Sequence, residues 1–133
     1  MIHEEICTYE VCKLAKEKGF PQDECGVNIG YYAWDGLRKI HSLVNSFAWY
    51  NEEYVHDNLY LAPTQSLLQR WLREEKGYYV YPFFDNESRR WTWVCRELTG
   101  DMWIQLLDFE ERYFDTYELA LEDALKYALE NLV

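Results

Sequence analysis

The sequence predicts an α+β domain in which an antiparallel β-sheet, made of a hairpin and a three-stranded meander, packs in two layers with about three helices. Apolar residues recur at helical spacing in residues 9–18, 64–76 and 115–133, whereas residues 78–109 alternate with a period of two. The turn dipeptide Asp35-Gly36 separates two further apolar runs. Amphipathic helices bury their apolar faces readily against a sheet, which gives the two layers.

The first helix is expected to begin after Thr8, because a threonine hydroxyl is a good N-cap. It should end at Gly19 in a Schellman motif, with the apolar Phe20 folding back on the last turn. Asp35-Gly36 then favours a two-residue turn between two antiparallel strands. Residues 46–61 fit either another strand or a loop, because aromatic and polar residues are mixed there without a period.

The central helix follows Pro63 and is expected to end at Gly77. Its apolar face comprises Leu67, Leu68, Trp71 and Leu72. The meander comes next, as strands over residues 78–84, 89–98 and 102–109. Pro82 has no N–H to donate, so the first of these strands should lie at a sheet edge or contain a bulge.

The carboxyl-terminal helix has two predicted start signals. Asp115 and Glu118 have the spacing of a capping box, and Phe114 and Leu119 have that of a hydrophobic staple. A broad apolar arc should lie across the sheet; its residues are Tyr117, Ala120, Leu121, Ala124, Leu125, Ala128 and Leu132.

Composition indicates a folded domain with an acidic region. At 133 residues, with 49% hydrophobic residues, the chain is expected to form a single domain over residues 1–133. Residues 97–133 account for −8 of the net charge of −11. Such a region repels phosphate backbones, so no direct binding of nucleic acid is expected. Aromatic residues make up 18% of the chain, and some of these rings should reach the surface. The tyrosines are expected mainly to lie half-buried on sheet faces with their hydroxyls in water, and use of the rings in interfaces is the alternative.

The sequence predicts a cytoplasmic protein. No run approaches the roughly 20 apolar residues that a membrane helix needs. The segment MIHEEICTYE also lacks the basic-then-apolar order of a signal peptide. The four cysteines are expected to be free thiols, because their spacing suits neither a secreted disulfide framework nor a zinc site; they are Cys7, Cys12, Cys25 and Cys95.

Candidate catalytic and ligand residues do not form a recognisable motif. They are His3, His41, His56, Asp57, Cys25, Cys95, Asp108, Glu110 and Glu111. No nucleophile, base and orienting group stand in a known pattern, and no glycine-rich phosphate loop is present. The three carboxylates at residues 108–111 fit an acidic connection better than a cation site, because no turn glycine accompanies them. We therefore expect no catalytic site, cofactor site or metal site.

A basic surface is expected, if anywhere, on the central helix. Arg70, Arg73 and Lys76 lie on its solvent side, and Arg89 and Arg90 can extend this surface. Trp71 belongs to the apolar face of the same helix, so it is expected in the core and not on a ligand platform.

Three segments of the chain resemble a family of small uncharacterised proteins. The segments are KLAKEKGF, LAPTQSLLQRWLREEKG and TYELALEDALKYALENL, in that order and at similar spacing. The family is associated with Bacteroides-group bacteria and with the phages and prophages that infect them, and it has no assigned activity. The resemblance therefore implies a mobile-element context and transfers no site residue.

These observations favour a non-catalytic protein-interaction module that binds a protein partner through exposed aromatic residues or through its acidic region. An acidic mimic of nucleic acid, which occupies the basic groove of a DNA- or RNA-binding protein, is the alternative. An enzyme of an unrecognised type is a third reading, and it requires a concave pocket with clustered titratable groups. The sequence gives no indication of the oligomeric state.

Overall fold

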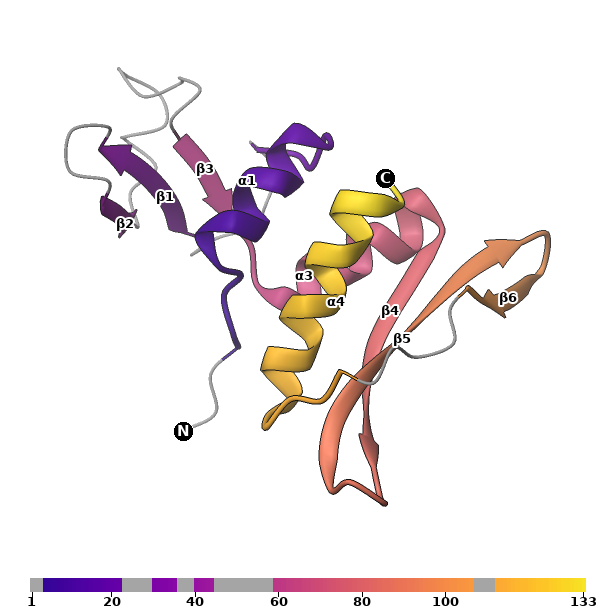
Figure 1. Ribbon diagram of the computed structural model, residues 1–133. Helices are drawn as coiled ribbons and strands as arrows, with labels where there is room; N and C mark the ends of the chain where they lie inside the picture. The colour runs from indigo at the N-terminus through magenta and orange to yellow at the C-terminus, as the bar shows by residue number, and fades with distance from the viewer. Residues whose placement is uncertain (1–3, 23–29, 36–39, 45–58, 107–111) are drawn as a thin grey trace. The chain divides into compact units, whose positions relative to one another are not determined.

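The computed structural model describes residues 4–22, 30–35, 40–44, 59–106 and 112–133 (Figure 1). It divides into two compact units, one formed by residues 1–5 and 65–133 and the other by residues 6–64. Helices and antiparallel sheets occur as separate elements, which confirms the α+β prediction. The prediction of a single domain stays a prediction. None of the helices in the described ranges is long and apolar enough to cross a membrane.

The unit of residues 6–64 packs helix α1 (Tyr9–Glu17) against a three-stranded antiparallel sheet. Its strands are β1 (Gly30–Asp35), β2 (Ile40–Val44) and β3 (Leu59–Ala62), in the order β2-β1-β3. Helix α1 contacts β3, where the Tyr9 and Tyr60 rings meet edge to face with centroids 5.4 Å apart. Among the residues of this unit whose burial the structure describes, the buried ones are mostly apolar; they are Cys7, Val11, Cys12, Ala15, Phe20, Tyr60, Leu61, Ala62 and Pro63.

Both ends of α1 form as the sequence predicts. The Thr8 hydroxyl accepts a hydrogen bond from the Val11 N–H. At the other end Gly19 has φ +94°, a left-handed conformation that glycine adopts without steric cost. The N–H of Phe20 donates to the Ala15 carbonyl at 2.8 Å, and the Gly19 N–H donates to the Lys16 carbonyl. These two bonds are those of a Schellman motif, and Phe20 is buried.

The predicted hairpin is present, but Asp35 lies in β1 and pairs with Ile40, so it is not a central turn residue as predicted. Strand pairing joins Asp35 to Ile40, so four residues, 36–39, connect β1 and β2. The residues of the connection lie outside the described ranges. Strand β3 falls in the segment that the sequence left open between strand and loop.

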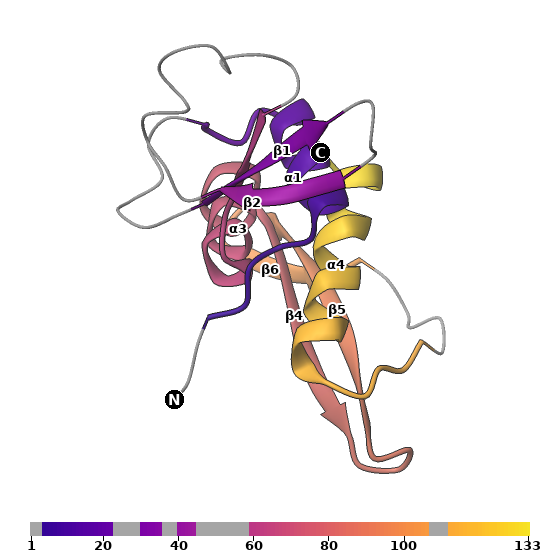
Figure 2. The ribbon, with the colours of Figure 1, turned by 90° about the vertical axis from the view of Figure 1, so that its left-hand side faces the viewer.

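The unit of residues 1–5 and 65–133 is a two-layer arrangement. Its sheet is the predicted meander, with β4 (Tyr78–Asp85), β5 (Arg90–Thr99) and β6 (Met102–Gln105) in the order β4-β5-β6. Helix α4 (Tyr117–Asn131) lies across one face of β4 and β5, as Figures 1 and 2 show.

The central helix is divided into two parts. Helix α3 (Gln65–Trp71) continues into a π-helical segment, η1 (Leu72–Lys76), which the sequence did not predict. Gly77 ends it with φ +75°, as predicted. Gln69 fastens α3 to the sheet, since its Nε2 donates to the carbonyl oxygen of Val80 at 2.7 Å in the edge strand β4.

The β4–β5 hairpin carries a four-residue connection between Asp85 and Arg90. The Asp85 carboxylate accepts from the Ser88 N–H at 3.0 Å, and hydrogen bonds from Ser88 lower the pKa of this carboxyl. Arg89 has φ +60° and its N–H donates to the Asp85 carbonyl. Pro82 lies in β4, which is an edge strand as predicted.

The inward face of α4 departs slightly from the predicted arc. Its buried residues are Ala120, Leu121, Ala124, Leu125, Ala128 and Leu129. Tyr117, which was expected in the arc, is 39% exposed because it lies in the first turn, where the helix reaches the rim of the sheet. Leu129 takes the place predicted for Leu132, which is the C-cap residue and only half-buried.

The predicted capping box of α4 is wrong by one residue. Thr116 is the N-cap: its backbone is extended and its hydroxyl accepts from the Leu119 N–H at 3.1 Å. Asp115 instead pairs with Arg90, with 3.1 Å between carboxylate oxygen and guanidinium nitrogen. Asp115 and Thr116 are both good capping residues. Asp115 forms the ion pair with Arg90, and Thr116 is left as the N-cap.

Replacement of Thr116 by alanine is therefore expected to lower the free energy of unfolding by about 1 kcal/mol, because a cap is lost. Asp115→Ala is the matched control, and it should cost about 0.5 kcal/mol or less, because the Arg90 pair is exposed to solvent. Urea denaturation of both variants measures the difference. Equal losses, or a larger loss for Asp115→Ala, would contradict the assignment.

Candidate interaction surface

The β4–β6 sheet has two faces of different character. Trp91 and Trp93 point toward α4, where they meet the rings of Tyr117 and Tyr127 with centroids 5.3 and 5.2 Å apart. Because side chains alternate along a strand, Thr92, Val94 and Arg96 point the other way. Register places Tyr81 opposite Val94 and Tyr79 opposite Arg96 on that second face.

We call this second side the aromatic face and define it by Tyr79, Tyr81, Arg96 and Trp103. The ring centroids of Tyr79 and Tyr81 are 4.7 Å apart, and those of Tyr79 and Trp103 are 5.9 Å apart. The Arg96 guanidinium lies over the Tyr81 ring at 5.8 Å. All four side chains are half-buried, so part of each is accessible to a partner.

Two arginines flank the tyrosine pair. Arg73, from the π-helical segment, lies over the Tyr79 ring at 5.5 Å, while Arg96 lies over Tyr81. Within the described residues, the Nε atom of Arg96 is buried and makes no hydrogen bond. Stacking on Tyr81 stabilises that charge in part, since a guanidinium is attracted to the face of an aromatic ring.

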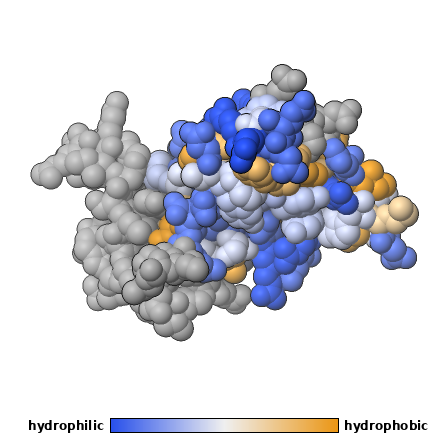
Figure 3. All heavy atoms as spheres, turned by 90° about the horizontal axis from the view of Figure 1, so that it is seen from below, coloured by the Kyte–Doolittle hydropathy of each residue, from blue (hydrophilic) through white to orange (hydrophobic). Residues whose placement is uncertain are grey.

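The β5–β6 hairpin also carries exposed apolar side chains. Leu98 lies on the aromatic face opposite Trp103, whereas Met102 and Ile104 point to the other face of the sheet. Leu98 is 44% exposed, Met102 68% and Ile104 47%. Figure 3 shows hydrophobic atoms at the surface at the right-hand end, where Figure 1 places β6.

Most residues of the predicted basic surface contact neighbouring side chains of the same chain. The Arg70 Nε lies 3.1 Å from a carboxylate oxygen of Glu74, and Lys76 lies over the Trp71 ring at 5.2 Å. Trp71 is half-buried and not fully in the core as expected, while Arg73 joins the aromatic face. Arg90 is paired with Asp115.

The candidate catalytic residues are not brought together by the described structure. His41 lies in β2 and Cys95 in β5. The others lie outside the described residues; they are His3, Cys25, His56, Asp57, Asp108, Glu110 and Glu111. Within the described ranges, no group of three or more His, Cys, Asp or Glu side chains is arranged to hold a metal ion.

Cys95 is poorly suited to be a nucleophile. Its side chain is 1% exposed, and burial, with a smaller contribution from Glu97, raises the pKa of the thiol from 9.0 to about 11. The reactive thiolate is therefore scarce at neutral pH. Cys7 and Cys12 are also buried.

Iodoacetamide at pH 8 should consequently alkylate Cys95 only after unfolding, as measured by peptide mass spectrometry with and without urea. The protonated thiol also links stability to pH. Because folding raises the thiol pKa, the protonated thiol contributes to the free energy of unfolding. This contribution is fully present below pH 9.0 and is lost as pH rises toward about 11. Rapid alkylation of Cys95 in the native protein would show that it is accessible and ionised.

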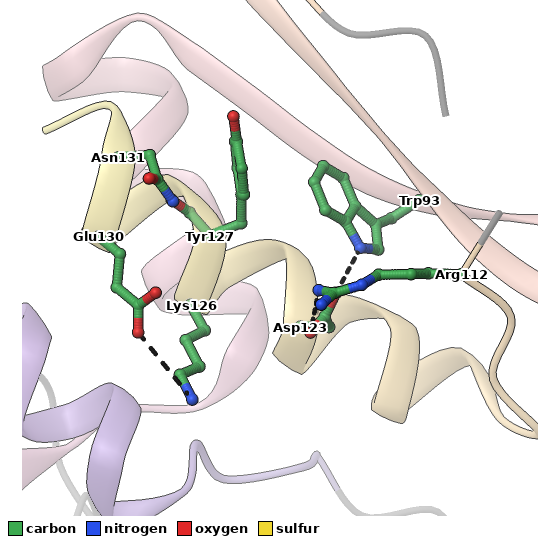
Figure 4. A network of polar contacts seen from close by, with 7 residues as sticks. All are labelled: Trp93, Arg112, Asp123, Lys126, Tyr127, Glu130 and Asn131. Carbon is green, nitrogen blue, oxygen red and sulfur yellow. Dashed lines mark hydrogen bonds and ion pairs between the residues drawn. The ribbon is translucent and has the colours of Figure 1, made fainter. Parts of the chain in front are cut away.

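Several acidic residues of the carboxyl-terminal region have structural partners. Asp123 accepts a hydrogen bond from the Trp93 indole at 2.9 Å and lies 3.4 Å from a guanidinium nitrogen of Arg112 (Figure 4). Glu130 lies 3.9 Å from Lys126 on the same helix. These contacts hold α4 to the sheet or stabilise the helix, so this part of the acidic charge serves the fold.

Asp123→Ala is expected to lower the free energy of unfolding by about 1–3 kcal/mol, because the mostly buried Trp93 indole loses its acceptor. Glu130→Ala removes the same charge from the same helix at an exposed pair, and should change stability by about 0.5 kcal/mol or less. Urea denaturation compares them. A neutral Asp123→Ala variant would mean that the indole finds another acceptor.

One shallow pocket of about 170 Å³ lies beside α3 and the start of α4. Polar groups in it bond to each other: Ser66 donates to Glu4 at 2.9 Å, and Gln65 donates to the carbonyl of Glu118 and the carboxylate of Glu122. It is smaller than the roughly 300–1,000 Å³ of typical ligand pockets. The pocket therefore does not support a small-molecule site.

Comparison with known proteins gives no match: no protein-family model, no curated protein and no solved structure is significantly similar to the chain.

Proposed function

We propose that this protein is a non-catalytic protein-interaction module and that its aromatic face is the binding surface. The observation that carries the proposal is the cluster of Tyr79, Tyr81 and Trp103 with Arg73 and Arg96 on the sheet face away from α4. Tyrosine, tryptophan and arginine are the residue types that dominate the energetic centres of protein interfaces.

The geometry of the cluster favours binding in a preorganised form. Each arginine is already stacked on a tyrosine, and the Tyr79 ring contacts Tyr81 in its own strand and Trp103 in β6, on the far side of β5. A partner therefore meets side chains that lose little freedom on binding, which lowers the entropy cost of association. Arg96 is half-buried and its Nε atom is enclosed, so a partner that brings a carboxylate or a carbonyl oxygen would meet the other nitrogens of the guanidinium.

The alternative functions have less support. An acidic nucleic-acid mimic needs carboxylates that are free to act as phosphates, whereas Asp115, Asp123 and Glu130 have partners within the chain. An enzyme needs a concave pocket with clustered titratable groups, and the pocket beside α3 is shallow. We also propose a cytoplasmic location, which the buried free thiols favour, and a phage or prophage origin.

The experiment is capture of partners from host lysate by the immobilised protein and by its Arg73→Glu variant, followed by affinity measurement on each purified partner. Reversal of the charge over Tyr79 should weaken binding at least about tenfold, as expected for a residue at the centre of an interface. Binding should persist in moderate salt, because aromatic contacts are less salt-sensitive than exposed ion pairs.

Arg70→Glu is the matched control, since it makes the same charge change one helical turn earlier, at a residue paired with Glu74 and not stacked on Tyr79. It should leave the affinity within about twofold. An equal loss of affinity in both variants, or release of every partner by moderate salt, would count against the aromatic face. Either result would favour the acidic nucleic-acid mimic, which binds through charge.

A further inference from the structure

The aromatic face and the arginine beside it offer hydrogen-bond donors that have no acceptor within the described residues. These donors are the guanidiniums of Arg73 and Arg96, the hydroxyls of Tyr79 and Tyr81, and the indole N–H of Trp103. None of the five side chains makes a hydrogen bond or an ion pair in the part of the chain that the structure describes. A surface that offers donors and no carboxylate is complementary to a ligand that brings acceptors.

Arg73 and Arg96 differ from the other arginines that the structure describes. Three of those others have a carboxylate oxygen within 3.4 Å; they are Arg70, Arg90 and Arg112. Arg89 lies exposed in the β4–β5 turn, where water solvates its charge. Arg73 and Arg96 are half-buried and lie over tyrosine rings instead. The chain has 24 Asp and Glu against 13 Lys and Arg, so carboxylates are plentiful, yet these two guanidiniums remain available to an external anion.

Both guanidiniums can be reached from outside. Among the described residues, the enclosed polar atom without a bond is the Nε of Arg96, so the two terminal nitrogens of Arg96 and all three nitrogens of Arg73 keep contact with solvent. From one guanidinium carbon to the other, the path through the two tyrosine ring centroids runs 5.5, 4.7 and 5.8 Å. The two charges are therefore at most 16 Å apart, and one short segment of a partner can contact both.

We propose, on the basis of the function proposed above, that the protein partner presents an acidic segment to the aromatic face, with one carboxylate on Arg73 and a second on Arg96. In an extended segment, side chains two residues apart are separated by about 7 Å and those four residues apart by about 13 Å. Both spacings lie within the limit of 16 Å. A guanidinium can bind a carboxylate through two parallel hydrogen bonds. Because these pairs form on a half-buried surface, salt screens them less than it screens exposed pairs.

The net charge of −11 comes mostly from other parts of the chain. Residues 65–96, which include both arginines, contain six lysines and arginines and four acids. Four acids of the region 97–133 lie on α4, which covers the other face of the sheet. A segment with two carboxylates thus meets a locally basic surface. A nucleic acid carries a charge on every nucleotide and is repelled by the acidic parts as well, so the observations favour an acidic protein segment over a phosphate backbone.

NMR titration of the full chain with two acetylated and amidated peptides, GELELEG and GQLQLQG, tests the proposal. The first should shift the Nε–H signals of Arg73 and Arg96 with a Kd on the order of 1 mM. The second has the same length but no charge, and should bind at least about tenfold more weakly. Arg96→Gln should lower the affinity for GELELEG at least about fivefold. Arg89→Gln is the matched control, since it removes the same charge from an exposed turn, and should leave the affinity within about twofold.

The comparison of the two peptides uses the unaltered protein, so it does not depend on the folding of any variant. Equal affinity for both peptides, no binding at about 10 mM GELELEG, or equal loss in Arg89→Gln and Arg96→Gln overturns the acidic segment. Tighter binding of an oligothymidylate of about eight nucleotides at the same two signals would assign the face to phosphate and overturn it as well.

Failure of this proposal is distinguishable from failure of the proposed function, because no cellular partner enters the peptide titration. A captured partner that is sensitive to Arg73→Glu, together with peptides that do not bind, would reject the acidic segment and keep the interaction module. Peptide binding at both arginines without any captured partner would reject the interaction module instead.

Discussion

Helix α4 can lie close against the sheet because three of its inward positions are alanines. Ala120, Ala124 and Ala128 are fully buried, and their small side chains let the helix approach β4 and β5 while its inward leucines fill the space at either side. The Trp93 indole satisfies its one donor on Asp123 of that helix, so a large ring is buried without an unpaired polar group. With α4 fixed on one side, every alternate residue of β5 must point to the other side, and this constraint creates the aromatic face.

Local patterns predicted the elements whose determinants lie within a few residues. Gly19 and Phe20 together specify a helix end, and the Schellman bonds form there. The change to a period of two after Gly77 predicted all three strands of the meander. Pro82 predicted that the first strand, β4, lies at the sheet edge. The alternation also placed Arg96 on the face opposite Trp93. In each case the side chain acts on its own backbone or on the next turn, so no distant contact was needed.

Features that depend on distant partners were missed or misplaced. Strand β3 forms by pairing with β1, far away in sequence, and its own residues lack a period. Asp115 is as good a cap as Thr116 until Arg90 is brought beside it. The π-helical segment has no sequence signature, yet it sets the position of Arg73 over Tyr79. Half-buried tyrosines on a sheet face were predicted, and Tyr79 and Tyr81 are such residues. Their cluster was not predicted, because which face α4 leaves open is a property of the packed unit.

Residues 6–64 are inserted into the other unit, and the two ends of the insert lie side by side. Ile6 bridges Thr64 within the insert, and the Gln65 N–H donates to the Glu5 carbonyl at 2.8 Å in the host unit. During synthesis on the ribosome the insert emerges whole before most of its host exists, so it has time to fold with its neighbours still absent. The host, by contrast, must wait for its last helix, since α4 supplies one layer of its core. Strands β4, β5 and β6, which carry the aromatic face, are thus synthesised only after the insert.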